Sequence, residues 1–252
     1  MEPDCKLEYY LNRCQELSAF STDRVKKLLK IISSLSAEKF LDIGCGDGTL
    51  TLLLGQAVKA KEMYGVDMSL PATKQAINKG VKARQLNIES DNLPFEGDYF
   101  DLILCGEVVE HLFEPVNLLR EIYRVLKRGG VLIITTPNLG SWYNRLSLLS
   151  GHQPFGTAAS LECPRAGKPL FTAHQGKTGM GDWGGEHIRV ITLAALKYLL
   201  KFCNFEILAV RGSYVSYKGS NFAYRLIRLI DRMTSLSPSL ATWMVIKARK
   251  PS

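Results

Sequence analysis

Apolar and polar positions along this chain predict short buried strands that alternate with helices. The predicted strands are brief apolar runs, and the predicted helices carry apolar residues at a spacing close to 3.6. Strands are expected at about 39–43, 61–67, 81–87, 100–105, 131–138, 205–212 and 241–249. Helices are expected at about 48–59, 70–79, 115–127, 141–149, 192–203 and 221–233. This alternation is typical of an α/β, doubly wound (Rossmann-like) fold with a mostly parallel sheet.

The chain before the first strand, residues 1–37, is predicted to form two N-terminal helices. In the second of them, from Arg24 to Leu35, apolar residues recur at helical spacing, and Thr22 or Asp23 is the expected cap. Such helices either border the mouth of a substrate site or simply cover the core. The pattern leaves both interpretations open.

The alternation of strands and helices breaks at residues 139–186. Apart from a short helix near its start, this segment interleaves glycines with aromatic residues. A loop of this length inside a compact domain is typically either functional or disordered. We therefore interpret 139–186 as a lid-like insertion within a single domain that spans 1–252.

A strongly amphipathic helix is predicted within residues 220–235. One face carries Phe222, Leu226, Leu229, Ile230 and Met233, and another carries Arg225, Arg228 and Arg232. A basic amphipathic helix suits a membrane surface or a lipid-like substrate, although a basic face is often only solvated. The predicted location is cytoplasmic, with membrane association through residues 221–233 as an option.

Composition supports an ordinary globular protein. The chain has 252 residues, of which 46% are hydrophobic, and contains neither an apolar run of 18 residues nor a signal-peptide pattern. Its six cysteines are scattered, which argues against a zinc site or a disulfide framework. The net charge of +8 is concentrated at the C-terminal end, where residues 201–252 hold nine Lys and Arg against two acids, a balance of +7. Nucleic acid, anionic lipid or an acidic substrate could meet such a surface.

The first predicted strand ends in the sequence DIGCGDG, residues 42–48. A strand, a glycine-rich turn and a helix N-terminus in this order bind nucleotide-like ligands, because the turn allows close approach and the helix offers free N–H groups. A third glycine at position 49 would complete a dinucleotide fingerprint, but that residue is Thr49. The pattern instead resembles the first motif of the class I S-adenosylmethionine (SAM)-dependent methyltransferases.

This resemblance implies an antiparallel last strand and a SAM site at the ends of the first three strands. Asp67, at the end of the second strand, would hold the ribose hydroxyls, and Asn87 would meet the adenine, where the family usually has Asp. The full set of implied cofactor residues is Asp42, Gly44, Cys45, Gly46, Gly48, Asp67, Met68, Asn87, Ile88 and Cys105.

A second motif, CGEVVEHL at 105–112, follows the fourth strand. On a helix, Glu107, Glu110 and His111 would share one face. The motif resembles those of the ubiquinone-biosynthesis O-methyltransferases and the small-RNA 2′-O-methyltransferases. In the latter branch a Glu-x-x-Glu-His motif and a later histidine, here His187, bind a divalent metal. The resemblance thus implies a Mg²⁺ or Mn²⁺ site at Glu107, Glu110, His111 and His187.

Other roles for these residues remain open. Metal-free members carry a similar pattern, so His111 or His187 could act as a general base, and Glu107 could simply lie near SAM. The expected activity is O-methylation of a small, apolar or quinone-like acceptor, with His111, Glu107 and His187 as catalytic residues. RNA 2′-O-methylation is a less favoured alternative, and a non-enzymatic SAM-binding partner protein is another.

Overall fold

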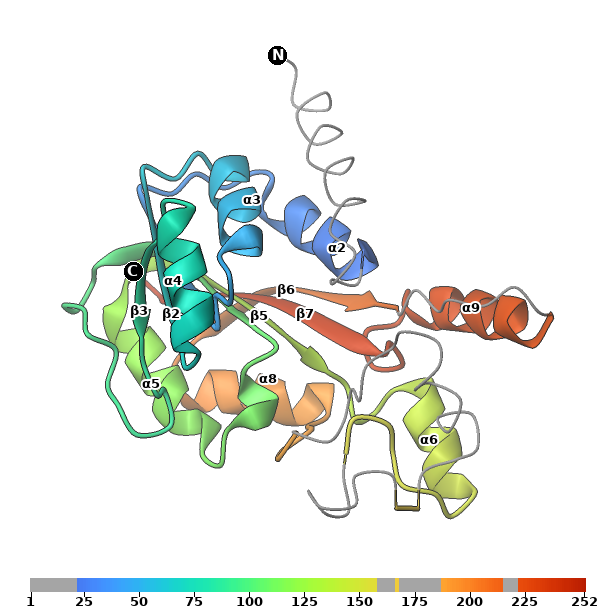
Figure 1. Ribbon diagram of the computed structural model, residues 1–252. Coiled ribbons are helices and arrows are strands. Elements are labelled where there is room, and N and C mark those ends of the chain that lie inside the picture. The colour runs from blue at the N-terminus through green and yellow to red at the C-terminus, as the bar shows by residue number, and fades with distance from the viewer. Residues whose placement is uncertain (1–21, 158–165, 168–186, 215–221) are drawn as a thin grey trace.

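A computed structural model describes residues 22–157, 166–167, 187–214 and 222–252. Within them the strands form one seven-stranded sheet in the order β3-β2-β1-β4-β5-β7-β6 (Figure 1). The strands are β1 (Lys39–Ile43), β2 (Glu62–Asp67), β3 (Lys82–Gln85), β4 (Phe100–Gly106), β5 (Leu126–Pro137), β6 (Glu206–Ser213) and β7 (Trp243–Arg249).

Strands β1 to β5 pair in parallel, and β7 is antiparallel to both of its neighbours, β5 and β6. The predicted doubly wound, mostly parallel sheet with an antiparallel last strand is therefore confirmed. Between β1 and β4 the strand order reverses its direction along the sheet. Ligands of open α/β sheets bind at such a point, beyond the carboxyl ends of the strands.

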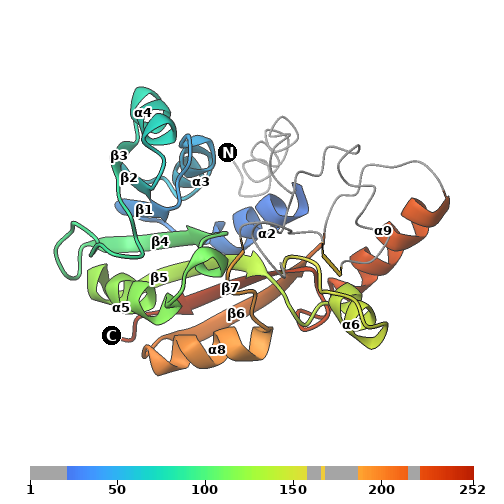
Figure 2. The ribbon, with the colours of Figure 1, turned by 60° about the horizontal axis from the view of Figure 1, so that its bottom comes forward.

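Helices cover both faces of the sheet (Figure 2). They are α2 (Thr22–Ile32), α3 (Thr49–Ala57), α4 (Leu70–Asn78), α5 (Pro115–Val125), α6 (Trp142–Leu149), α8 (Leu193–Phe202) and α9 (Phe222–Thr234), with a 3₁₀ turn η2 at Val109–His111. Helices α5 and α8 pack on one face, and α2 and α3 pack on the other.

The core follows from the period-two pattern of the strands. In β4, Ile103 and Cys105 face α5 and α8, whereas Leu102 and Leu104 face α2 and α3. Both sets are buried, so the central strands are apolar throughout, as expected for a parallel sheet covered on both sides. The rigid sheet fixes the ends of β1, β4 and β5, from which the site residues project.

Two predicted elements differ from the structure. The helix predicted to end at Lys127 ends at Val125, because Leu126 is already extended and pairs with Phe100 of β4. The expected helix through Glu107 is also wrong, since Glu107 has a φ of +57° and helical structure begins only at Val109.

The helix predicted ahead of Arg24 and most of the predicted insertion at 139–186 lie outside the described residues. Among the helices that the structure does describe, none combines the length and apolarity needed to cross a bilayer.

Candidate cofactor and metal site

The glycine turn joins the end of β1 to the start of α3. Gly44, Gly46 and Gly48 all have positive φ angles, which glycine adopts without the strain of a side chain. A Cβ on Gly44 would lie 2.5 Å from the Val108 Cγ2 atom, so the turn also requires a glycine for packing. The two sequence motifs are thus in direct contact at this point.

Asp67 ends β2 beside this turn. Its Oδ2 accepts a hydrogen bond from the Gly46 N–H at 2.8 Å, and its Oδ1 accepts one from the Ser69 N–H at 2.8 Å. These bonds fix the orientation of the carboxylate. Each oxygen retains a lone pair, so the carboxylate can still accept from a pair of ligand hydroxyls, as the ribose assignment requires.

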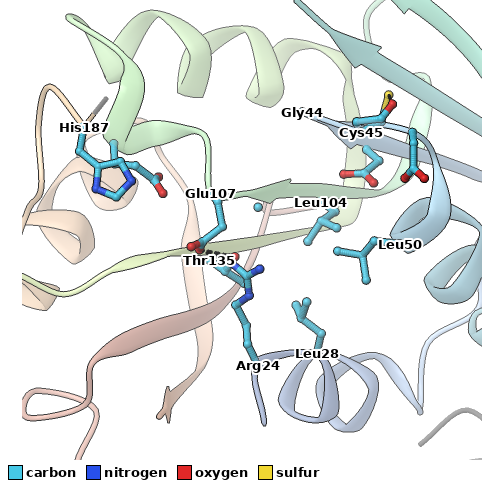
Figure 3. A pocket seen from close by; sticks show the side chains of 14 residues that line it. Arg24, Leu28, Gly44, Cys45, Leu50, Leu104, Glu107, Thr135 and His187 are labelled. Atoms are coloured by element: carbon cyan, nitrogen blue, oxygen red, sulfur yellow. Dashed lines mark hydrogen bonds and ion pairs between the residues drawn. The ribbon is translucent and has the colours of Figure 1, made fainter. Parts of the chain in front are cut away.

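A cavity of about 440 Å³ runs from the glycine turn to the end of β5 (Figure 3). At one end it is lined by residues of the turn and of the preceding strand, and at the other by residues that follow β4. Its lining comprises Arg24, Leu28, Asp42, Gly44, Cys45, Gly46, Asp47, Leu50, Leu104, Gly106, Glu107, Glu110, Thr135 and His187. The cavity therefore connects the predicted cofactor turn with the predicted catalytic residues.

Glu107 is held near the middle of this cavity by three side chains. Arg24 of α2 forms an ion pair with it, with 2.6 Å between Nη1 and Oε1, and Thr135 Oγ1 donates to Oε1 at 3.1 Å. Trp243 Nε1 donates to Oε2. Both carboxylate oxygens are therefore engaged by protein groups, and Glu107 stands apart from the ligand cluster predicted around it.

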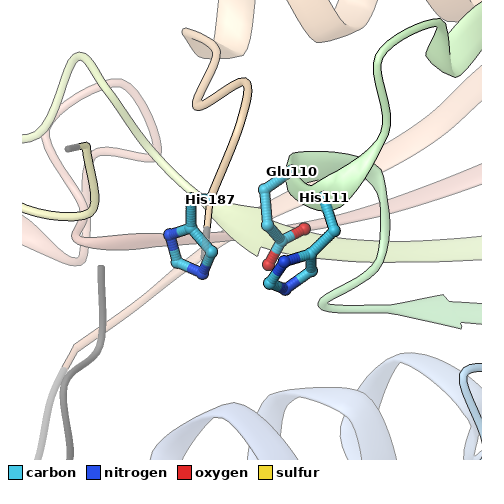
Figure 4. A group of neighbouring side chains, drawn as sticks. All are labelled: Glu110, His111 and His187. Atoms are coloured by element: carbon cyan, nitrogen blue, oxygen red, sulfur yellow. The ribbon is translucent and has the colours of Figure 1, made fainter. Parts of the chain in front are cut away.

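Glu110 and His187 line the other end of the cavity, and His111 lies beside them (Figure 4). One ligand atom from each lies within 4.8 Å of the others, and the two imidazole rings are 4.8 Å apart between centroids. The segment that carries His187 is fixed in place because the Ile188 and Arg189 N–H groups both donate to the Glu110 carbonyl at 2.9 Å. Of the four metal ligands predicted from the sequence, the structure brings these three together.

Glu110 is a buried carboxyl group with only half of its hydrogen bonds made. Thr136 Oγ1 donates to Oε2 at 3.0 Å, whereas Oε1 is buried and has no hydrogen-bond partner. Burial and the nearby charge of Glu107 raise the pKa of Glu110 to about 8. An unpartnered buried carboxylate oxygen is costly, and a bound cation would remove that cost.

The histidine opposite is oriented by the backbone. His187 Nδ1 lies 2.9 Å from the Gly156 carbonyl oxygen, which can only accept, so Nδ1 donates as an N–H and Nε2 carries the lone pair in the neutral form of the ring. Metal-binding histidines are commonly oriented in this way by a carbonyl that accepts from the other ring nitrogen.

Two buried groups beside the glycine turn have raised pKa values. Burial raises the pKa of Asp42 to about 7, even though Thr51 Oγ1 donates to its Oδ2 at 2.6 Å. Burial also raises the pKa of the Cys45 thiol to about 12, with a further contribution from Asp42 and Asp67. The Cys45 side chain is thus a neutral part of the cavity wall.

Several residues predicted to touch the cofactor lie outside the cavity lining. Met68 is exposed next to Asp67, and the Asn87 Oδ1 accepts from the Glu89 N–H at 3.1 Å within a tight turn. Ile88 packs against the core, and Cys105 is fully buried within β4, where its neighbour Gly106 reaches the cavity instead. Contacts of these residues with SAM remain predictions.

Arg24 is the main site residue that the sequence analysis missed. It lies one helical turn before Leu28 on the apolar face of α2, and both residues line the cavity. An arginine within an otherwise apolar face could have signalled a buried partner. Trp243 and Thr135 had no such signal, because both lie in apolar strands far along the chain.

Comparison with known proteins agrees with this geometry. Residues 41–134 match a family described as a methyltransferase domain. A ubiquinone biosynthesis O-methyltransferase from Pseudomonas putida (strain GB-1) is 32% identical over 111 residues, which cover 42% of this chain and 47% of that protein. A relative with the same name from Alkalilimnicola ehrlichii is 29% identical over 131 residues, 50% of this chain and 52% of its own. The chain thus spans about half the length of the curated relatives that it matches.

Solved structures extend the likeness to the whole fold. A SAM-dependent methyltransferase from Thermotoga maritima aligns with a TM-score of 0.57 at 18% identity, covering 99% of this chain and 100% of that one. A methyltransferase studied with the Haloferax volcanii Trm112 methyltransferase activator aligns with a TM-score of 0.65 at 12% identity, covering 98% of both chains. Residues 41–134 thus match a methyltransferase-domain family, and the chain has the fold of the class I SAM-dependent methyltransferases.

Proposed function

We propose that this protein transfers the methyl group of SAM to a hydroxyl of a small apolar acceptor, with a divalent cation held by Glu110, His111 and His187. One observation carries the proposal: a single cavity joins the glycine turn to this cluster. SAM would supply an electrophilic methyl group at the boundary between the two ends. In-line transfer of this methyl group then needs only an acceptor oxygen held on the side of the methyl carbon away from the sulfur.

The cofactor end offers groups suited to each part of SAM. Asp67 would accept from the ribose hydroxyls, and the free N–H groups at the start of α3 would favour the methionine carboxylate. The Arg24 guanidinium lines the same cavity, and its buried Nε has no hydrogen-bond partner among the described residues. We assign Arg24 to the carboxylate as well, because a charge-assisted bond there would satisfy a buried donor.

The ligand cluster fits a divalent cation by its chemistry. One carboxylate and two imidazoles suit Mn²⁺, Fe²⁺ or Zn²⁺, whereas Mg²⁺ prefers oxygen ligands and would need further water or acceptor oxygens. The unpartnered Oε1 of Glu110 and the oriented ring of His187 support this use. When bound, the cation would lower the pKa of an acceptor hydroxyl.

If no cation binds, the same residues could still move a proton. The pKa of Glu110 is raised to about 8, and its carboxyl group lines the cavity and has an oxygen within 4.8 Å of a His111 ring nitrogen. Such a carboxylate could accept the proton of an acceptor hydroxyl directly. The two routes differ in their response to chelators, which makes them separable.

Three features favour a small acceptor oxygen. Relatives that share the matched segment are named ubiquinone biosynthesis O-methyltransferases. Leu28, Leu50 and Leu104 form an apolar wall between α2 and β4 (Figure 3). At the end of β4, Gly106 is followed by Glu107, without the Asn-Pro-Pro-Tyr sequence of enzymes that methylate amines on nucleobases.

The decisive experiment is to follow labelled methyl from SAM into a cell extract fractionated into apolar metabolites, polar metabolites and RNA. We expect label in an apolar product that is stable to base, as an ether is. Methyl transfer should fall in the Glu110→Ala variant. It should also fall when a chelator is added to the wild-type protein, and added Mn²⁺ should then restore it. Label in RNA would instead support the 2′-O-methylation alternative. Cofactor binding without any transfer would support a non-enzymatic partner.

A further inference from the structure

Exposed apolar side chains are concentrated on α6, on α9 and just beyond α9. Those on α9 recur at helical spacing and thus form one stripe, which Leu236 continues past the helix end. The set comprises Leu146, Leu148, Leu149, Phe222, Leu226, Leu229, Met233 and Leu236, of which Leu149, Phe222 and Leu236 are 84%, 80% and 81% exposed. Exposed apolar patches of this kind mark interaction surfaces rather than ordinary solvated faces.

Side-chain hydrogen bonds connect α6 to α9 and α9 to the segment just before β7. The indole Nε1 of Trp142, at the start of α6, donates to Asp231 Oδ1 of α9 at 2.9 Å, and Thr242 Oγ1 donates to the same oxygen. In both ribbon views the two helices lie at the same end of the molecule, with α9 extending away from the sheet (Figures 1 and 2). The apolar side chains thus belong to one protruding end of the protein.

The charges at this end are basic. Arg145 of α6 and Arg225 and Arg232 of α9 are exposed, whereas the only acidic residue on either helix, Asp231, is fully buried. An apolar stripe next to exposed arginines, with no exposed acid on either helix, complements a surface that is apolar inside and negative outside. An anionic lipid surface has this character.

We propose that α6 and α9 together dock the protein onto an anionic lipid surface. RNA would satisfy the arginines but leave the apolar stripe exposed to water. In a dimer packed through this face, the arginines of one protomer would meet the arginines of its partner, and neither helix has an exposed acid to pair with them. A lipid surface alone satisfies both observations.

This docking face connects to the candidate site by two short steps. Asn144, buried on α6, accepts from the Phe155 N–H through Oδ1 at 2.7 Å and donates through Nδ2 to the Phe155 carbonyl at 3.2 Å. The next residue, Gly156, accepts the hydrogen bond from His187. The lipid-facing end therefore lies on the acceptor side, so an apolar acceptor could enter from the membrane. Entry of the acceptor from the membrane rests on the proposed function, whereas docking itself does not.

Flotation of the full chain with vesicles tests docking without requiring SAM or turnover. Vesicles of phosphatidylcholine with phosphatidylglycerol should bind the protein at low salt, and phosphatidylcholine alone should bind it weakly. Arg225→Gln with Arg232→Gln should weaken binding by roughly 30-fold, given about one decade for each 1.4 kcal/mol and about 1 kcal/mol for each basic residue. Leu226→Ser with Leu229→Ser and Met233→Ser should weaken it by at least about 10-fold.

Matched controls lie elsewhere on the molecule. Lys74→Gln with Arg84→Gln removes the same charge from exposed positions on α4 and β3, and Tyr198→Ser with Phe202→Ser removes exposed aromatic area from α8. Both control variants should bind vesicles as the wild type does, and thermal melts should show that every variant is folded. Equal binding by the α9 variants would overturn the proposal, as would no binding to anionic vesicles. It would also be overturned by a dimer in sedimentation that the serine variant dissolves, or by RNA that the arginines bind more tightly than vesicles.

Discussion

Arg24 and Glu107 form a partly buried ion pair, with 2.6 Å between Nη1 and Oε1, that links the N-terminal helix α2 to the loop after β4. The pair sits in the wall of the cavity that joins the glycine turn to the ligand cluster (Figure 3). Trp243 and Thr135 complete the contacts of Glu107. The left-handed backbone at Glu107, with a φ of +57°, is a conformation that costs of order 1 kcal/mol and persists only where surrounding contacts require it.

The first prediction concerns Arg24. If the guanidinium binds the carboxylate of SAM, Arg24→Gln should lower SAM affinity by about 10- to 100-fold, the range expected for a lost charge-assisted hydrogen bond. Glu107→Gln leaves Arg24 in place and should have a smaller effect on SAM. Calorimetry with SAM and with S-adenosylhomocysteine would measure both. Unchanged affinity in Arg24→Gln would restrict the arginine to its structural pairing with Glu107.

The second prediction concerns Asp67. We expect micromolar binding of SAM, near −8 kcal/mol, and no measurable binding of NAD. Asp67→Ala should lose about 1.5–3 kcal/mol, because the charge-assisted bonds to the ribose hydroxyls disappear. Glu38→Ala removes an exposed acid far from the turn and serves as the control. Tight NAD binding, or an Asp67→Ala protein that binds SAM as well as the wild type, would refute the assignment.

The third prediction concerns pH. The pKa of Glu110 is raised from its ordinary 4.5 to about 8, so the folded protein holds a proton that the unfolded chain releases. Without metal, the contribution of Glu110 to the free energy of unfolding should therefore be greatest below pH 4.5. It should fall by a few kcal/mol as the pH rises to 8. Asp42, raised from 3.8 to about 7, contributes in the same direction over a lower range.

Glu110→Gln should remove the Glu110 part of this dependence, because the amide does not titrate and can still accept from Thr136. Denaturant unfolding between pH 5 and 8 would measure the free energy of unfolding of both proteins. As the pH rises, the wild type should lose stability relative to the variant. Parallel curves for the two proteins would show that Glu110 is not an isolated buried acid. Mn²⁺ should stabilise the wild type most at the upper end, where the carboxylate is ionised.

The fourth prediction concerns the ligand cluster. If Glu110 and His187 act through one cation, the double variant Glu110→Ala with His187→Ala should lose little more activity than either single variant. SAM affinity should survive in all three, since the glycine turn lies at the other end of the cavity and Asp67 is hydrogen-bonded to that turn. His152→Ala, at an exposed histidine outside the cavity lining, is the control. Additive losses, or turnover that EDTA leaves unchanged, would favour proton transfer without a metal.

Local sequence patterns determined the order of strands and helices and the position of the glycine turn. These features depend on near neighbours: short apolar runs in β1 and β4, glycines where φ must be positive, and Ser141 and Thr192 as helix caps. The glycine pattern and the acid at Asp67 also pointed to the methyltransferase family, which the comparisons confirm. Each of these signals spans a short stretch of chain, and therefore it can be read without the fold.

The tertiary structure alone decided which side chains share the site. Helical spacing placed Glu107 with Glu110 and His111, but the backbone turns at Glu107, and its carboxylate meets Arg24 and Trp243 instead. Those partners come from α2 and β7, near opposite ends of the chain, and only the order of strands in the sheet brings them together. The burial that raises the pKa of Glu110 has the same origin, because desolvation depends on every element packed around the group rather than on its sequence neighbours.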